Sequence, residues 1–169
     1  MNIRTAVLSD AHAIAEVHVR TWQAAYRGIV PDAYLNALSV DRREALWRES
    51  ILQGTSEIWV ADRESVVTGW VAFCPSRDRD ATPTVGEVAA IYVTPGHWST
   101  GTGRDLLNVA LRRLSERHFR SVTLWVLEEN ERAIRFYRAA GFKPEAASRK
   151  DIDIGGKLLS EIRYERSLD

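Results

Sequence analysis

Two glycines separated by one residue, Gly101 and Gly103, mark the segment of this sequence best suited to bind an anion. They follow a predicted buried strand, residues 85–93, and precede a predicted helix with one apolar side. The first turn of a helix has backbone N–H groups without intrahelical partners, at the positive end of the helix dipole. Glycine lacks a Cβ, so backbone can approach a ligand closely. The segment is a candidate phosphate cradle, although a flexible strand-to-helix turn explains the glycines equally well.

Two common nucleotide motifs do not fit this segment. A dinucleotide fingerprint requires a third glycine at the position of Leu106. A P-loop requires Lys and then Ser or Thr after its last glycine, where the chain has Arg104 and Asp105. Ordinary NAD and ATP sites are therefore disfavoured.

Three stretches, in order along the chain, resemble the GCN5-related N-acetyltransferases. The cradle and the strand before it resemble that family's acetyl-CoA-binding core: Glu87-x-x-x-Ile91-Tyr92-Val93-x-Pro95, then Gly101-x-Gly103-x-x-Leu106-Leu107. The next stretch resembles its second motif: Leu124-Trp125-Val126-Leu127-Glu128-x-Asn130-x-x-Ala133-x-x-Phe136-Tyr137-x-x-x-Gly141-Phe142. The head is similar to one broad bacterial branch: Trp22-x-x-Ala25-Tyr26-Arg27-Gly28-Ile29-Val30-Pro31.

The resemblance implies a fold, a reaction and a binding site. The fold is a single α/β (α+β) domain over residues 1–169, with a mixed, mostly antiparallel central sheet flanked by helices. Acetyl-CoA is the implied cosubstrate, in a V-shaped opening between the strands that end near Val93 and Leu127, and an amine attacks its thioester directly in a ternary complex. The implied cofactor-binding residues are Ile91, Tyr92, Val93, Ser99, Thr100, Gly101, Thr102, Gly103, Arg104 and Asn130.

The chain departs from the family pattern at the start of the glycine loop. Trp98 stands where the family commonly has Gln or Arg, and Ser99 stands where Gly is frequent. Backbone N–H groups still donate after such changes, but a polar side chain is lost. Arg104, at the exit of the loop, is a candidate to supply the missing charge to a phosphate.

Acetyl transfer to an amine requires two proton movements. An alkyl ammonium has a pKa of about 10.4, so little free amine exists at pH 7 and a base or a proton route is needed. The leaving thiolate, with a pKa of about 8.5, departs more readily when it is protonated. The carbonyl oxygen gains charge during attack, and backbone N–H groups near residues 91–93 are candidates to stabilise it.

Glu87 is the candidate base, because the histone-acetylating branch carries its catalytic glutamate at this position relative to the loop. On a regular strand Glu87 shares a face with Ala89, Ile91 and Val93, an assignment that a bulge in the strand would alter. The alternative is a strand-end carboxylate paired with one of the chain's 20 arginines.

Tyr137 is the candidate acid, since a phenol with a pKa of about 10 stays protonated at pH 7. Its alternative is a core tyrosine, because Ala133, Phe136 and Ala140 lie on the same apolar stripe. Asn130 is predicted to cap the next helix, to hydrogen-bond the pantetheine arm, or to do both.

Several weaker candidates surround this set. Trp22 and Tyr26, one helical turn apart, wall a substrate cleft or simply pack in the core. Residues 77–80 and 149–153 are charged segments that rim an acceptor mouth or are only solvated loop and strand-edge residues. Cys74 has no activating partner, and the four histidines show no metal-ligand spacing, so no metal is assigned.

The elements that position these residues follow from the apolar periodicity. Strands are expected at 3–7, 58–61, 66–73, 85–93 and 122–127, with two more between 142 and 166 around a turn at residues 155 and 156. Helices are expected after a cap at Ser9 or Asp10, over 41–52, after Gly103, and over 133–140, the last ended by Gly141 in a left-handed conformation. Residues 76–84 are expected to be a hairpin connection.

Composition excludes several classes of protein. The 169 residues carry 23 basic and 23 acidic side chains, so no whole-domain basic field favours nucleic acid. One cysteine excludes an intramolecular disulfide, and no apolar run approaches the roughly 20 residues of a membrane span. We expect a cytoplasmic N-acetyltransferase without nucleic-acid or membrane partners, acting on a small-molecule or peptide amine; homodimers are common among relatives. The alternatives are a non-catalytic acyl-CoA sensor and a protein lysine or N-terminal acetylase.

Overall fold

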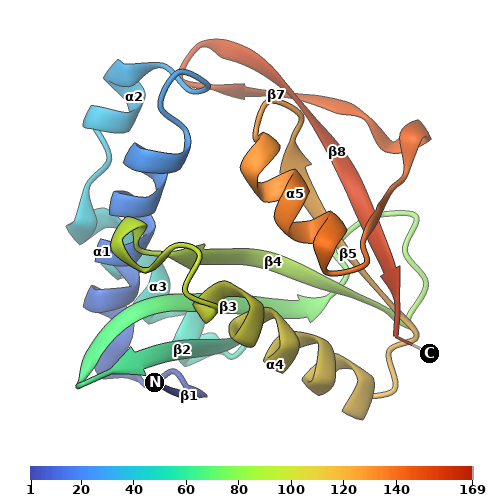
Figure 1. Ribbon diagram of the computed structural model, residues 1–169, viewed down its shortest axis with the longest axis horizontal. Helices are drawn as coiled ribbons and strands as arrows, with labels where there is room; N and C mark the ends of the chain where they lie inside the picture. Colours follow the sequence, from blue (N-terminus) through green and yellow to red (C-terminus); the bar gives the residue numbers. More distant parts are fainter. Residues whose placement is uncertain (169) are drawn as a thin grey trace.

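A single eight-stranded sheet forms the centre of the molecule (Figure 1). The computed structural model describes residues 1–168, apart from the side chain of Ala146. Strand order is β1-β2-β3-β4-β5-β8-β6, with β7 paired to β8. Only the β4–β5 pair is parallel among the described pairs, which confirms the mixed, mostly antiparallel sheet. The strands are β1 Asn2–Thr5, β2 Glu57–Arg63, β3 Val66–Pro75, β4 Val85–Val93, β5 Ser121–Leu127, β6 Lys143–Pro144, β7 Lys150–Ile154 and β8 Lys157–Ser167.

Helices cover both faces of this sheet (Figure 1). On one face α1 packs Ile14 and Val17 against Val60 and Trp70. On the other face α4 buries a stripe that contains Leu107 and three further leucines, with α5 beside it. The apolar spacing of three and four residues in α1 and α4 therefore marks the faces that pack on the sheet. The helices are α1 Ala11–Ala25, α2 Asp32–Asn36, α3 Val40–Gln53, α4 Thr102–Glu116 and α5 Glu131–Ala139, with 3₁₀ turns η1 Leu8–Asp10, η2 Pro95–His97 and η3 Ala146–Ser148.

The sheet opens between β4 and β5. These two strands pair at only three positions, from Val85 with Ser121 to Glu87 with Thr123. Beyond Glu87 no described strand pairs with that edge of β4, whereas β5 stays paired with β8 along its length. The strands thus diverge toward Val93 and Leu127, as expected for the V-shaped opening.

A bulge in β4 changes the predicted face of Glu87. Ala72 pairs with Ala90 and Phe73 with Val88, so Ala89 is the extra residue. Ile91 and Val93 consequently pack with Val88 on the α4 side, while Ala90 and Tyr92 pack on the α1 side. Glu87 lies opposite Cys74, on the α1 side. The expectation that it shares a face with Ile91 and Val93 is therefore wrong.

Most of the local signals succeed, but α4 begins at Thr102 rather than after Gly103, and the short elements α2 and β6 are not among the expected ones. The strand at 85–93, the connection at 76–84, the turn at Gly155-Gly156 and the left-handed Gly141 (φ +85°) all occur as predicted. Asp10, however, does not cap α1 with its side chain. Its carboxylate instead accepts bonds from Arg4, at 2.6 and 2.9 Å, and from the backbone N–H of Val7. Because Arg4 on β1 binds this carboxylate, Asp10 does not use it to cap the helix.

Candidate active site

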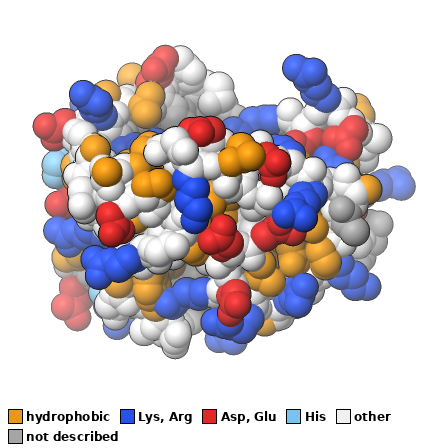
Figure 2. Space-filling view, turned by 90° about the horizontal axis from the view of Figure 1, so that it is seen from above, with side chains coloured by type: hydrophobic (Ala, Val, Ile, Leu, Met, Phe, Trp, Pro, Cys, Tyr) orange, Lys and Arg blue, Asp and Glu red, His pale blue; other side chains and the backbone are white. Residues whose placement is uncertain are grey.

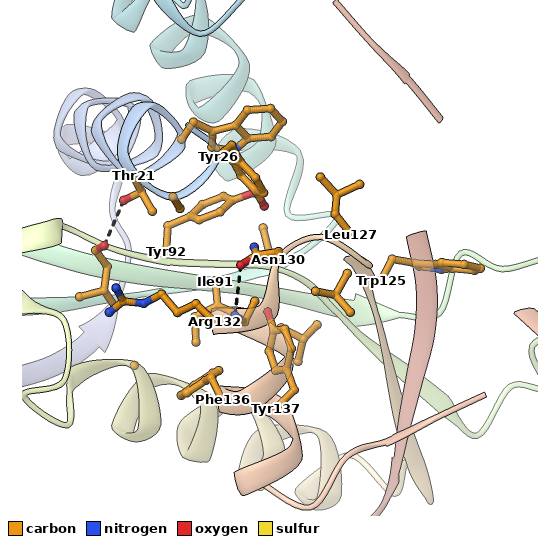
Figure 3. A pocket seen from close by; sticks show the side chains of 18 of the residues that line it. Thr21, Tyr26, Ile91, Tyr92, Trp125, Leu127, Asn130, Arg132, Phe136 and Tyr137 are labelled. Carbon is orange, nitrogen blue, oxygen red and sulfur yellow. Dashed lines mark hydrogen bonds between the residues drawn. The ribbon is translucent and has the colours of Figure 1, made fainter. Parts of the chain in front are cut away.

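A cleft of about 1280 Å³ follows the gap between β4 and β5 (Figure 3). We call its two ends the loop end and the hairpin end. The loop end lies at the C-terminal end of β4 and is lined by His97, Trp98, Ser99, Gly101, Gly103, Arg104, Arg132, Arg135 and Phe136. The hairpin end lies beside the β3–β4 connection and the β7–β8 hairpin and is lined by Arg77, Asp78, Glu87, Trp125, Lys150, Ile152 and Glu161.

Backbone geometry shapes the loop end. Gly101 has φ +92° and directly precedes α4, and Ser99 has φ +62°. Glycine adopts such a φ at little cost, so the chain can turn sharply into the helix. The unpaired N–H groups of the first turn of α4 are the anion-binding groups that the sequence predicts here. The hydroxyls of Thr100 and Thr102 bond to each other at 3.0 Å and do not line the cleft.

Trp98 has two specific contacts at this end. Its indole N–H donates to the carbonyl oxygen of Val93 at 2.6 Å. The guanidinium carbon of Arg132, from α5, lies 3.6 Å from the centroid of the Trp98 ring. The hydroxyl of Thr21 donates to the same carbonyl at 3.1 Å, so both lone pairs of the Val93 oxygen are used. Trp98 therefore ties the loop to β4 and supports a cation.

Three arginines make the loop end positive. Arg104, Arg132 and Arg135 all line it, and only Arg135 has a carboxylate partner among the described residues, Glu131 at 3.3 Å. Burial, followed by the charge of Arg135, lowers the pKa of Arg132. Unpaired guanidinium groups beside unpaired backbone N–H groups suit a polyanionic ligand.

The centre of the cleft brings four polar side chains together (Figure 3). Tyr26 and Tyr92 lie on one side of Asn130, with Tyr137 on the other. Asn130 caps α5, because its Oδ1 accepts from the N–H of Ala133 at 3.2 Å, which leaves its amide NH₂ to donate elsewhere.

Tyr137 lines the cleft and belongs to the core at once. It is 9% exposed and packs on Phe136 and Phe142. Burial raises the pKa of Tyr137, and burial also raises the pKa of Tyr26. Both phenols therefore remain protonated at neutral pH and can donate hydrogen bonds.

Glu87 is almost fully buried and is held by Arg77. The guanidinium Nε donates to Oε2 at 3.1 Å and Nη2 donates to Oε1 at 2.5 Å, while the backbone N–H of Arg77 adds a bond to Oε2 at 3.0 Å. The structure thus contains the arginine ion pair that was the alternative to a catalytic role for Glu87. Among the described residues, Oε1 accepts only the bond from Nη2 of Arg77 and keeps a lone pair for another donor.

Trp125 forms the floor of the hairpin end. Its indole N–H donates to both oxygens of Asp78, at 3.1 and 3.3 Å. The ammonium nitrogen of Lys150 lies 3.5 Å from the centroid of the ring and pairs with Glu161 at 3.2 Å. Arg163 holds Asp78 at 3.1 Å. Side chains from four separate segments fix this end.

Trp22 and Tyr26 line the cleft as well as packing together, at 4.7 Å between ring centroids. The described residues contain no group of three or more His, Cys, Asp or Glu side chains placed to hold a metal ion. None of the helices between residues 1 and 168 is long and apolar enough to cross a membrane.

Comparisons with known proteins agree with this geometry. A model of the acetyltransferase (GNAT) family matches residues 16–142. The uncharacterized N-acetyltransferase YuaI of Bacillus subtilis is 34% identical over 163 residues, which is 96% of this chain and 90% of that protein. The chain therefore belongs to the GNAT family and is an acyltransferase.

Solved structures share the fold. The PaiA N-acetyltransferase of Thermoplasma acidophilum, in complex with coenzyme A, has a TM-score of 0.80, with 20% identity and 98% of each chain covered. YncA of Salmonella typhimurium, with acetyl-CoA, has a TM-score of 0.75, with 24% identity, 100% of this chain and 94% of that chain covered. At these identities the likeness establishes the fold.

Sequence reasoning missed part of the site. Arg132 and Glu161 were not singled out, and Trp125 was noted only as part of a motif. Each depends on tertiary contacts: Arg132 is a site residue because it stacks on Trp98, and Trp125 because it packs under Lys150. The available signal for Arg132 was a cation in the first turn of the helix that follows β5.

Proposed function

We propose that the protein transfers the acetyl group of acetyl-CoA to a primary amine. The observation that carries the proposal is the continuous cleft from a cationic, glycine-containing helix start to a divergence of β4 and β5. The loop end suits the phosphates of coenzyme A: backbone N–H groups of α4 would contact them, with Arg104 and Arg132 beside them. Relatives in fold that were solved with coenzyme A or acetyl-CoA support this assignment.

Acetyl-CoA supplies the thioester, and the chain supplies proton transfer and orientation. The amine nitrogen forms a bond to the acetyl carbon as the carbon–sulfur bond breaks. Tyr137 donates its proton to the departing sulfur and is reprotonated from solvent. Glu87 takes one proton of the ammonium group through a water molecule at the remaining lone pair of Oε1 and passes it to solvent, which leaves the free amine. The attacking nitrogen loses a second proton by the same route once its bond to the acetyl carbon has formed. The products are therefore the amide, the thiol and one released proton.

The backbone along the unpaired edge of β4 completes the proposed site. Ile91 and Tyr92 line the cleft where that edge has no strand partner, so their peptide groups are available to the pantetheine arm and to the carbonyl oxygen. The carbonyl of Val93 is already saturated by Thr21 and Trp98. The NH₂ of Asn130 is a further donor to the pantetheine arm.

Two measurements test the proposal on the purified chain. Calorimetry with coenzyme A should give saturable heat, and acetyl-CoA incubated with a panel of amines and peptides should release thiol. Binding without release on any amine would indicate an acyl-CoA sensor instead, and release only with peptides a protein acetylase. Absence of coenzyme A binding would overturn the proposal.

A further inference from the structure

The hairpin end of the cleft is lined by three acids and two bases, but it exposes mainly the bases. The Glu87 side chain is 5% exposed, whereas that of its partner Arg77 is 67% exposed. Glu161 is 15% exposed, and its partner Lys150 is 49% exposed. In both ion pairs the carboxylate lies beneath the cation, so a ligand in this end first meets positive charge.

The third ion pair at this end does not offset that charge. Asp78 is 16% exposed, and both of its oxygens accept from the indole of Trp125 while Oδ2 also accepts from Arg163. Its oxygens are therefore largely occupied. Of the acids that line this end, Asp78, Glu87 and Glu161 are all directed to partners within the protein.

The guanidinium group of Arg77 is oriented by Glu87 and keeps a nitrogen that can donate to an anion. Glu87 engages Nε and Nη2 of its guanidinium, and Nη1 has no partner among the described residues. An arginine fixed by one carboxylate loses less side-chain entropy when it binds a second one. Lys150 is similarly fixed over the Trp125 ring, at 3.5 Å.

The remaining lining of the cleft at this side is apolar and aromatic. Ile152 and Ile154 of β7 face it together with Trp125, and Trp22 of α1 and Tyr26, directly after α1, continue this lining. A bound molecule would thus meet exposed cations on one side and apolar side chains on the other. An amine with a carboxylate and an apolar body has the matching chemistry.

We propose that Arg77 and Lys150 bind the carboxylate of the acetyl acceptor, and that the acceptor is a small apolar amino acid or a related amino carboxylate. This inference rests on the proposed acetyltransferase function and names the substrate class of the same site. Arg77 and Lys150 are specificity residues in this scheme, and Glu87 also positions Arg77.

Matched acceptors test the inference with the whole chain and acetyl-CoA. Thiol release is measured for phenylalanine against phenethylamine and for leucine against 3-methylbutylamine, which differ only in the carboxylate. A charged hydrogen-bonded contact predicts kcat/KM about ten- to hundredfold higher for the amino acid of each pair. Aminophosphonate analogues show whether the site requires a carboxylate or accepts other anions.

Variants then assign the preference to residues. Arg77→Gln should lower the ratio of kcat/KM between amino acid and amine about tenfold or more, mainly through KM of the amino acid. Lys150→Met should lower the same ratio and, because Lys150 is surface-exposed, provides a second test if Arg77→Gln folds poorly. Arg79→Gln, an exposed arginine of the same loop outside the cleft, is the matched control and should leave the ratio unchanged.

The outcomes are distinguishable. If wild-type protein uses the decarboxylated amines as well as the amino acids, the inference is overturned while the acetyltransferase function stands. If both variants lower activity on both members of a pair equally, the two cations have only a structural role and the inference also fails. If no amine in any panel releases thiol, the proposed function itself fails.

Discussion

Both ends of the cleft expose cationic side chains, but these side chains rest on different kinds of support. At the loop end, consecutive residues 97–104 and the start of α4 provide backbone N–H groups, and the arginines beside them are almost free of acidic partners. At the hairpin end, side chains come from the β3–β4 connection, β4, β5, β7 and β8, and each lining cation covers a carboxylate that is less exposed than the cation itself.

This difference has consequences for how each end responds to substitution. A site made from backbone groups survives a change of side chain, which explains how the loop can carry Trp98 where the family commonly has a polar residue. A site made from interlocked side chains changes its chemistry with each substitution. The loop end therefore suits a ligand that relatives share, and the hairpin end suits a ligand particular to this chain. On the face seen from above in Figure 2, Lys and Arg intermingle with Asp and Glu, so charge is not separated by sign across that face.

The largest expected effect lies between the two ends, at Tyr137. Tyr137→Phe removes the proposed acid and should lower kcat about hundredfold with every acceptor, because general acid catalysis contributes roughly 10²–10⁴-fold. The KM for acetyl-CoA should change little. Since burial raises the pKa of Tyr137, its deprotonation should not cause any loss of activity below pH 10. Steady-state thiol release from pH 6 to 10 measures all three quantities.

Tyr164→Phe is the control for this substitution. Tyr164 is 2% exposed in the same core and does not line the cleft, so loss of its hydroxyl should leave kcat within about twofold. Full turnover of Tyr137→Phe would show that Tyr137 is only a core residue.

The second expected effect is on stability and concerns His18 of α1, the helix that forms one wall of the cleft. This residue is 6% exposed; Nδ1 accepts from the Trp47 indole at 3.4 Å, and Nε2 is buried without a partner among the described residues. Burial, and then the charge of Arg43, lowers its pKa to about 3. Between pH 6.5 and 3 the unfolded chain therefore binds a proton that the folded chain does not. The contribution of His18 to the free energy of unfolding therefore falls as pH falls, by about 1.4 kcal/mol per pH unit.

Urea unfolding at pH 6.5 and 4.5 measures this contribution. His18→Gln should lose about 2–3 kcal/mol less of its free energy of unfolding over that interval than the wild type. His118→Asn is the control, because His118 is exposed and asparagine tolerates its φ of +63°. An equal acid loss in His18→Gln and wild type would contradict the buried neutral state of His18.

Sequence predicted the loop end better than the hairpin end for a physical reason. Strand β4, the left-handed turn at Gly101 and the start of α4 depend on local periodicity and on glycine, which a short stretch of sequence reveals. The face of Glu87 depends on a bulge, which only the pairing with β3 defines. The role of Trp125 at the site depends on two long-range contacts. One is with Asp78, 47 residues away in the sequence, and the other is with Lys150 on β7. No local pattern encodes such contacts.

The third expected effect tests the backbone support of the loop end. Gly101→Ala places a Cβ at φ +92°, which costs about 1–2 kcal/mol and should weaken coenzyme A binding about tenfold. Gly96→Ala is the control, because Gly96 has no positive φ and a Cβ there meets nothing within 4 Å. Calorimetry gives the two dissociation constants. Equal affinities would mean that the turn at Gly101 does not shape the phosphate site.

The smallest expected effect tests whether side chains matter at the loop end at all. Arg132→Ala should raise the dissociation constant of coenzyme A about three- to tenfold at low salt, and less at high salt, where exposed charges are screened. Arg138→Ala, an exposed arginine of the same helix outside the cleft, should have no effect.

Trp98→Gln then shows whether the stacked ring positions this arginine, since the guanidinium lies 3.6 Å from the ring centroid. If it does, loss of Arg132 costs less in the Trp98→Gln background than in the wild type, by about 0.5–1 kcal/mol of coupling free energy. Additive losses would show that the ring does not position Arg132 and that any contribution of this arginine to binding is independent of Trp98.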